Sequence, residues 1–165
     1  MKKLNPTIIG VVVIGIILVG GTLLAFAASR TAATAQYARG DTNRPHLEIG
    51  QTDFGFGTLS LSEIKTQDIT IQNTGKGTLI LSDFITSCDC TFAQVIINGQ
   101  SSPKFSMHRN PNWRGEILPN RTATIKIIYE PKIMPVKGAV QRQVVFRTND
   151  PEKPLVNIRF TARVQ

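Results

Sequence analysis

The chain has 165 residues and a formal net charge of +8, with 19 lysines and arginines against 11 aspartates and glutamates. Its length allows one domain with a hydrophobic core beyond an N-terminal segment and excludes two. It has two histidines, and it lacks a Ser-His-Asp signature, a phosphate-binding glycine loop and a paired-carboxylate motif. We therefore expect a protein that is not an enzyme and that holds no cofactor.

Residues 8–28, IIGVVVIGIILVGGTLLAFAA, contain no charged side chain. As a helix they would be roughly 30 Å long, which matches the hydrocarbon thickness of a bilayer. Lys2 and Lys3 precede this segment, so the positive-inside bias places residues 1–7 in the cytoplasm and exports the rest to the periplasm or the cell surface. A cleaved signal peptide is the alternative, because Ala25-Phe26-Ala27 forms a small-residue cleavage pattern. The length of the apolar run favours an uncleaved signal-anchor helix.

The next segment, residues 29–44, is small and polar without apolar periodicity, and we interpret it as a flexible linker. Residues 45–165 then form the extracytoplasmic domain. Of the 19 basic residues, 17 lie beyond residue 28, together with all 11 acidic ones. This excess suggests an anionic surface or an acidic protein as partner rather than nucleic acid, the alternative being a charged surface that only keeps the domain soluble.

Beyond residue 45 the apolar residues alternate with polar ones, which is the period of β-strands. The clearest examples are residues 69–72, 124–129 and 156–164. Turn-forming residues separate such stretches at 73–77, 119–120, 137–138 and 149–151. No helical period of ten or more residues follows residue 28. About seven or eight short strands are therefore expected, in an all-β antiparallel sandwich.

Several short motifs occur in an order that resembles a known family. They are Asp53–Gly57, Gln72–Gly75, Leu79–Leu81, Thr86–Thr91 with the sequence TSCDCT, and Asn149–Pro154 with the sequence NDPEKP. This order is similar to that of an uncharacterised bacterial exported family with a Ser-Cys-x-Cys-Thr motif, related to the Hydin-like and PapD-like immunoglobulin folds. The resemblance covers about Leu47 to Val164, and it implies an immunoglobulin-like β-sandwich of unassigned molecular function.

The chain departs from the family pattern in three places. Asp89 stands between the cysteines where a small residue is usual, and Asn120 follows Pro119 where glycine is usual. Both residue types tolerate a left-handed backbone better than most, so we expect the turns to form. The third departure is the long segment 98–118.

Cys88 and Cys90 are the only cysteines. Export would place them where oxidation is allowed. In an extended strand their Cβ atoms would be farther apart than the roughly 3.8 Å that a disulfide needs, so a bond between them requires a turn at Asp89. We favour a structural role, as a disulfide or as two packed thiols, over a redox-active pair or a soft-metal site. The side chains that could complete a metal site are His46, His108, Met107 and Met134.

The segment 101–118 is the best candidate for contact with a partner. It holds the single tryptophan, Trp113, with Lys104, Arg109 and Arg114 close in sequence. Tryptophan and arginine are enriched at the centres of interfaces. Two other interpretations stay open: Trp113 closes an edge of the core, or the segment lies on a membrane surface.

We predict a non-catalytic, membrane-anchored binding or assembly module, attached to the bilayer through residues 8–28. An exposed face or edge strand would dock a protein partner. One alternative is a single-pass accessory subunit of a larger membrane complex. Another is a thiol-redox or copper-handling protein that uses Cys88 and Cys90.

Overall fold

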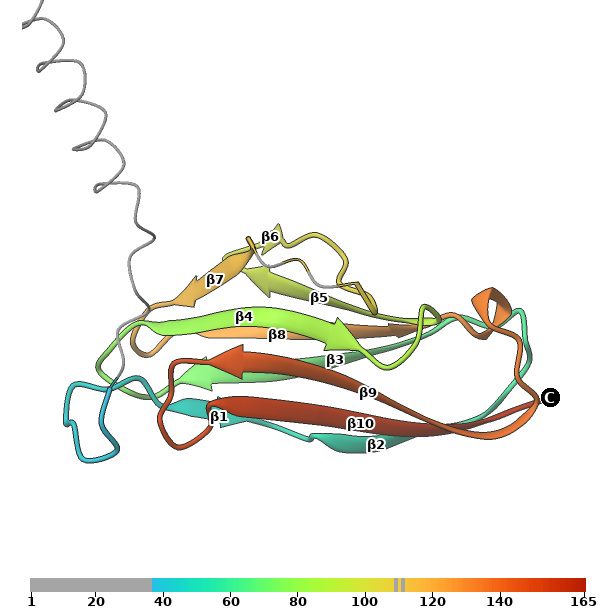
Figure 1. Ribbon diagram of the computed structural model, residues 1–165, viewed down its shortest axis with the longest axis horizontal. Coiled ribbons are helices and arrows are strands. Elements are labelled where there is room, and N and C mark those ends of the chain that lie inside the picture. The colour runs from blue at the N-terminus through green and yellow to red at the C-terminus, as the bar shows by residue number, and fades with distance from the viewer. Residues whose placement is uncertain (1–36, 109, 111) are drawn as a thin grey trace, which may run out of the picture. The chain divides into compact units, whose positions relative to one another are not determined.

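The computed structural model describes residues 37–108, 110 and 112–165, which form two β-sheets packed face to face (Figure 1). In chain order the elements are β1 (Leu47–Ile49), β2 (Asp53–Leu59), β3 (Lys65–Asn73), β4 (Leu79–Thr86), β5 (Thr91–Ile97), β6 (Gln100–Ser101), β7 (Arg114–Ile117), β8 (Thr122–Tyr129), the 3-10 helix η1 (Pro131–Ile133), β9 (Gly138–Thr148) and β10 (Leu155–Val164). The expected all-β sandwich is confirmed. The expected membrane helix, residues 8–28, lies outside the described residues, and within them no helix is long and apolar enough to cross a bilayer.

The first sheet has the strand order β1-β3-β8-β5-β6 and the second has the order β2-β10-β9-β4-β7. All neighbouring strands are antiparallel except β2 and β10, which are parallel. The prediction of a purely antiparallel sandwich is therefore wrong for β2. The reason is that the chain leaves the first sheet after β1 and crosses to the second sheet at residues 50–52. There it continues as β2, beside β10, which runs in the same direction.

The described residues contain ten strands, more than the seven or eight expected. The additional strands come from two places. The first strand is divided into β1 and β2, and the atypical segment 98–118 contributes the short strands β6 and β7. The strands predicted from the clearest alternation are present as β3, β8 and β10, and each predicted turn lies between strands. Asn120 has a φ of 59°, the left-handed conformation expected for it, whereas Asp89 is not among the described residues with positive φ.

The core fills the space between the sheets because alternate side chains of each strand point inward. Along β10 every second residue from Val156 to Val164 is buried. Aromatic rings form two clusters, and in one of them the Phe84 ring stacks on Phe146 at 4.6 Å and on Phe105 at 4.8 Å between centroids. Each such ring contributes about 1.5–3 kcal/mol through burial alone.

The sandwich has two opposite ends (Figure 1). We call the base the end formed by residues 37–46 and the loops 74–78, 118–121 and 149–154. The tip is the opposite end, formed by the loops 60–64, 87–90 and 130–137 with the C-terminal Gln165. Backbone N–H groups at the base connect Lys76 and Gly77 to the carbonyl oxygen of Arg44, at 3.0 and 3.2 Å. The chain therefore enters the domain at the base.

Candidate functional site

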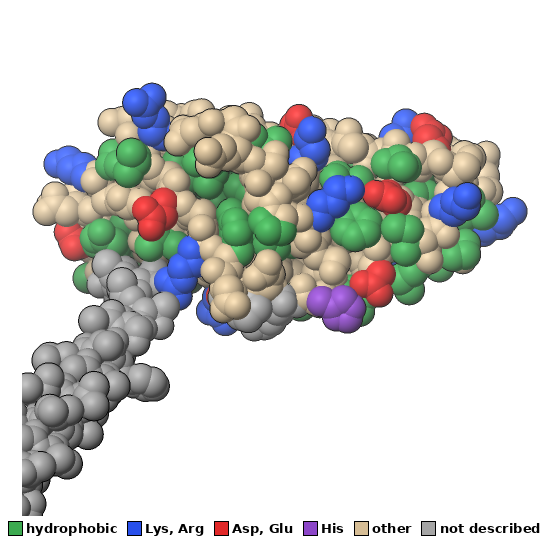
Figure 2. Space-filling model, turned by 90° about the horizontal axis from the view of Figure 1, so that it is seen from above, with side chains coloured by type: hydrophobic (Ala, Val, Ile, Leu, Met, Phe, Trp, Pro, Cys, Tyr) green, Lys and Arg blue, Asp and Glu red, His purple; other side chains and the backbone are tan. Residues whose placement is uncertain are grey.

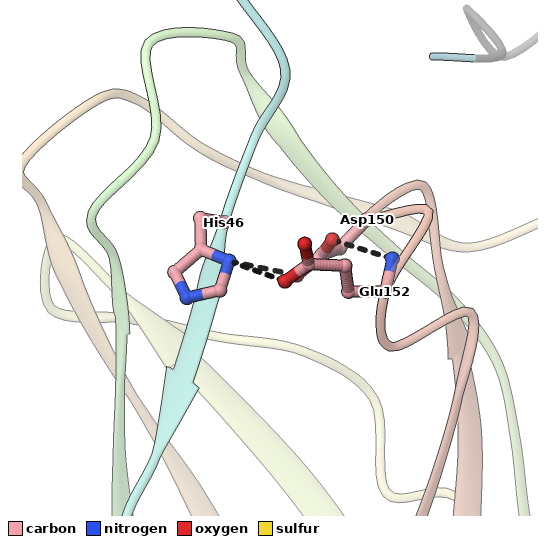
Figure 3. A group of neighbouring side chains, drawn as sticks. All are labelled: His46, Asp150 and Glu152. Atoms are coloured by element: carbon pink, nitrogen blue, oxygen red, sulfur yellow. Dashed lines mark hydrogen bonds and ion pairs between the residues drawn. The ribbon is translucent and has the colours of Figure 1, made fainter. Parts of the chain in front are cut away.

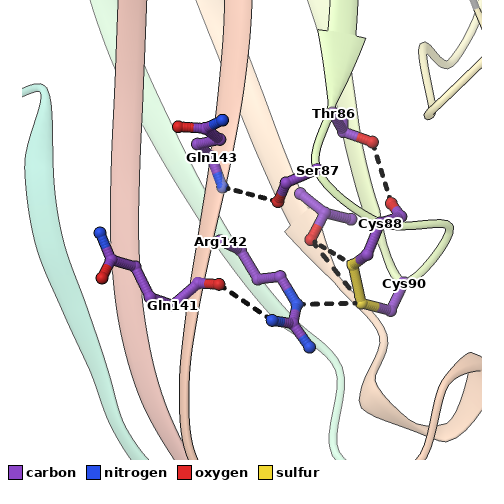
Figure 4. Close-up of a disulfide and its surroundings, with 8 residues drawn as sticks. Thr86, Ser87, Cys88, Cys90, Gln141, Arg142 and Gln143 are labelled. Carbon is purple, nitrogen blue, oxygen red and sulfur yellow. Dashed lines mark hydrogen bonds between the residues drawn. A yellow bond between two sulfur atoms is a disulfide. The ribbon is translucent and has the colours of Figure 1, made fainter.

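The two cysteines lie at the tip, where the chain passes from β4 in the second sheet to β5 in the first. Cys88 and Cys90 form a disulfide with Cα atoms 5.2 Å apart (Figure 4). A turn closes the small ring, since the N–H of Thr91 donates to the carbonyl of Cys88 at 3.1 Å. This is the turn at Asp89 that a disulfide between cysteines two residues apart requires.

The surroundings of the disulfide are those of a packed structural corner. Cys88 is 4% exposed and Cys90 is fully buried. The Nε of Arg142 donates to the sulfur of Cys90 at 3.4 Å, and the N–H of Gln143 donates to the hydroxyl of Ser87 at 3.0 Å (Figure 4). Attack on a disulfide needs access to a sulfur atom, which this corner restricts.

The other candidate metal ligands do not surround the sulfur atoms. His108 lies nearby but is 87% exposed in its side chain, 4.0 Å from the carboxylate of Asp89. Met107 and Met134 are both 42% exposed. His46 lies at the base, at the other end of the sandwich. In the described residues both sulfur atoms are bonded to each other and neither is a free thiol.

His46 belongs instead to a polar cluster at the base with Asp150 and Glu152 (Figure 3). Its Nδ1 lies 3.6 Å from a carboxylate oxygen of each. The carboxylate of Asp150 is fully buried and accepts the N–H groups of Leu47 and Glu152 at 2.8 and 2.9 Å. Arg44 binds both carboxylates, Asp150 at 3.3 Å and Glu152 at 2.6 Å.

Three potential metal ligands meet in this cluster. Asp150 already accepts three hydrogen bonds from the protein, and Glu152 accepts one from Arg44. The guanidinium group supplies the positive charge that two carboxylates need. The cluster therefore fastens the entering chain to the β9–β10 loop. The NDPEKP motif alone does not predict this contact, because the partners are about 105 residues apart in the chain.

The buried amide of Asn73 completes the base. Its oxygen accepts the N–H groups of His46 and Gly75 at 3.2 and 3.0 Å, and its nitrogen donates to the carbonyls of Gly77 and Ile117 at 2.8 and 2.9 Å. One side chain thus satisfies four backbone groups from three segments. This explains the asparagine of the Gln-Asn-Thr-Gly motif in physical terms.

Trp113 lies on one side of the sandwich, between the two sheets. Its ring packs edge-on against Phe105 and Phe84, with centroids 4.9 and 5.7 Å away. It is half-buried and contacts the core from outside. A Cβ on Gly115 would lie 2.5 Å from Cη2 of Trp113, so a glycine is needed for the indole to lie across β7. Trp113 thus closes this side of the core.

A hollow of about 260 Å³ lies in front of this indole. It opens between β6 and β7, the outermost strands of the two sheets on that side (Figure 1). Val95, Ile97 and Trp113 supply apolar lining. Exposed polar residues from both strands form the rim, namely Gln100, Ser101, Arg114 and Glu116.

The structure therefore brings together only part of the predicted contact residues. Trp113 and Arg114 line the hollow. Lys104 lies elsewhere, with its Nζ 5.6 Å from the centroid of the Phe92 ring and 3.9 Å from the carboxylate of Glu130. Arg109 lies outside the described residues.

Comparisons with known proteins agree with this architecture. A family described as "Protein of unknown function (DUF1573)" matches residues 47–102, about a third of the chain. No protein of curated function matches. Among solved structures, a protein of unknown function from Porphyromonas gingivalis W83 is 22% identical with a TM-score of 0.56, covering 82% of this chain and 51% of that one. The chain thus spans about half the length of that protein.

Two further structures are similar at lower scores. The ASH / PapD-like domain 7 of human CEP192 is 12% identical with a TM-score of 0.49, covering 83% of this chain and 94% of that one. The YadV chaperone is 16% identical with a TM-score of 0.43, covering 72% and 52%. The expected likeness to an uncharacterised family is thus found over residues 47–102, and the described domain shares the fold of a bacterial protein of unknown function.

Proposed function

We propose that this chain is a non-catalytic binding module that docks a segment of a protein partner at the hollow beside Trp113. The observation that carries the proposal is the position of the hollow between two strand edges. On the side away from β4, no strand of the described residues pairs with β7. An extended segment could therefore add to that edge and place a side chain in the hollow.

The chemistry of the hollow suits a peptide. Its volume of about 260 Å³ is below the range of about 300–1,000 Å³ typical of small-molecule sites. The lining offers apolar contact, while the amide of Gln100 and the hydroxyl of Ser101 offer hydrogen bonds. The Glu116 carboxylate forms no ion pair with a described residue, and it favours a donor or cation on the partner.

Attachment to a membrane through residues 8–28 is part of the same proposal, with residues 1–7 cytoplasmic and the β-sandwich periplasmic or at the cell surface. Its support is the uncharged apolar run after Lys2 and Lys3. The module would then act within reach of the bilayer.

Co-purification tests the proposal. The full chain with a C-terminal tag is isolated in mild detergent, and its partners are quantified by mass spectrometry. Ser101→Arg places a long side chain in the exposed rim without touching the core, and it should remove the specific partners. Thr122→Arg is the control, because Thr122 is also exposed but starts β8, away from the hollow. Retention of every partner by Ser101→Arg contradicts the proposal.

A further inference from the structure

The tip carries exposed apolar side chains that neither the core nor the proposed docking hollow uses. Ile133, Met134 and Val136 are 47%, 42% and 45% exposed in the loop between β8 and β9, and Ile64 is 59% exposed in the loop between β2 and β3. Exposed apolar residues scattered singly are ordinary, but a group at one end of a domain marks an interaction surface. Hydrophobic side chains also reach the surface beside lysines and arginines in the view of Figure 2.

Two lysines bracket this apolar run, which reads Lys132-Ile-Met-Pro-Val-Lys137. Both are exposed, and neither forms an ion pair with a described residue. On the loops that carry the apolar residues, the carboxylates of Glu63 and Glu130 are already paired, with Lys65 at 2.6 Å and with Lys104 at 3.9 Å. Asp89, on the third loop of the tip, lies 4.0 Å from His108. The tip therefore presents one lysine on either side of its apolar residues, each without an ion pair to a described residue.

The shape of the tip is held in place before any binding. Pro131 is buried at the start of η1, and Pro135 lies between Met134 and Val136. Proline restricts the backbone, so little conformational entropy remains to be lost on binding. Between the two loops lies a mainly apolar hollow of about 310 Å³, lined by Leu61, Ile64 and Ile133.

We propose that the tip is a binding surface for anionic lipid, independent of the protein-docking hollow. The charge pattern carries this choice: apolar side chains enter the boundary between headgroups and acyl chains, while the two lysines contact negatively charged headgroups. A run of consecutive exposed apolar residues needs no shape complementarity when its partner is a lipid surface. If the tip instead docked a protein, substitutions in the tip would remove a co-purified protein partner. The test below includes this outcome.

Vesicle flotation tests this proposal with the full chain. The protein is held through its own apolar segment in nanodiscs of phosphatidylcholine, and acceptor vesicles contain either phosphatidylcholine alone or one part phosphatidylglycerol to two parts phosphatidylcholine. We expect flotation with the anionic vesicles only. Raising NaCl from about 0.05 to about 0.5 M should release the protein, since it shortens the screening length.

Two pairs of substitutions separate the contributions of the apolar residues and of the lysines to vesicle binding. Ile133→Ser with Met134→Ser should reduce flotation to the level of neutral vesicles. Lys132→Gln with Lys137→Gln should weaken binding about 30-fold, from about 1 kcal/mol per lysine near an anionic surface. Leu118→Ser with Leu155→Ser is the matched control, because these residues are 55% and 57% exposed at the base.

The outcomes separate the two proposals. Equal binding to neutral and anionic vesicles, no binding to either, or an equal loss in the base control overturns the lipid proposal. Loss of co-purified proteins in the tip variants without any vesicle binding also overturns it and assigns the tip to a protein partner. The salt titration uses the wild-type chain, so it decides the question even if a tip variant fails to fold. Failure of Ser101→Arg to remove partners bears only on the docking hollow.

Discussion

The buried carboxylate of Asp150 offers the sharpest test of how the base is held together. Asp150→Asn keeps the shape of the side chain but replaces one acceptor oxygen by an NH₂ group. The carboxylate now receives three hydrogen bonds, from the N–H groups of Leu47 and Glu152 and from the guanidinium of Arg44. The amide can accept on one side only, so a buried donor is left facing another donor.

The expected cost is about 3 kcal/mol of unfolding free energy, because a buried donor loses its partner and the charged guanidinium loses a buried anion. Glu152→Gln is the matched control on the same loop. Its side chain is 42% exposed, and an exposed pair with Arg44 contributes about 0–1 kcal/mol even at 2.6 Å. Asp150→Asn should therefore lower the free energy of unfolding clearly more than Glu152→Gln does.

Urea unfolding of the full chain in detergent, followed by fluorescence, measures both variants. The single tryptophan reports on the domain, since it packs on Phe84 and Phe105. With a typical slope, the midpoint for Asp150→Asn should fall by about 1–2 M. Equal midpoints for the two variants, or a loss under about 0.5 kcal/mol for Asp150→Asn, would refute the argument that the base depends on the buried carboxylate.

Three further changes have expected outcomes in the same assay. Gly115→Ala should cost about 1–3 kcal/mol and shift the emission of Trp113, because the new Cβ would overlap the indole; an unchanged spectrum would contradict this packing. Tyr129→Phe should raise the free energy of unfolding by about 1 kcal/mol, because the buried hydroxyl has no hydrogen-bond partner in the described residues. Burial also raises the pKa of this hydroxyl, and Arg142 acts in the opposite direction. A large loss of stability in Tyr129→Phe would reveal a partner. Replacing Cys88 and Cys90 together by serine should cost about 1.5 kcal/mol, the loop-closure entropy of a ring with a sequence separation of 2; a loss above about 4 kcal/mol would mean that packing at the corner dominates.

The strands themselves could be predicted because alternation is a local property. In β3, Ile69 and Ile71 are buried between exposed or half-buried polar neighbours, as their spacing indicates. The turn at Asn120 likewise follows from a residue type that accepts a positive φ. Strand pairing is not local, and the parallel pair of β2 with β10 brings together segments about 105 residues apart.

The candidate sites were predictable only in part. Trp113 could be identified as a candidate because it is the single tryptophan and has basic residues close in sequence. Its contacts with Phe84 and Phe105 could not be predicted, because the three rings belong to three different segments of the chain. The apolar tip was missed, although Ile133-Met-Pro-Val136 breaks the polar-apolar alternation and could have signalled an exposed loop. Polar-apolar alternation predicts which face of a strand is buried. It does not predict which apolar residues of a loop remain exposed.

The sequence by itself determined the strand periodicity, the position of the turns, the all-β class and the uncharged run at residues 8–28, because each depends on neighbouring residues. Only the tertiary structure decided that Asp150 is buried under Arg44, that the cysteines lie in a closed turn, and that two lysines bracket an apolar tip. Burial and charge balance depend on which distant segments meet, and that is settled by the packing of the two sheets.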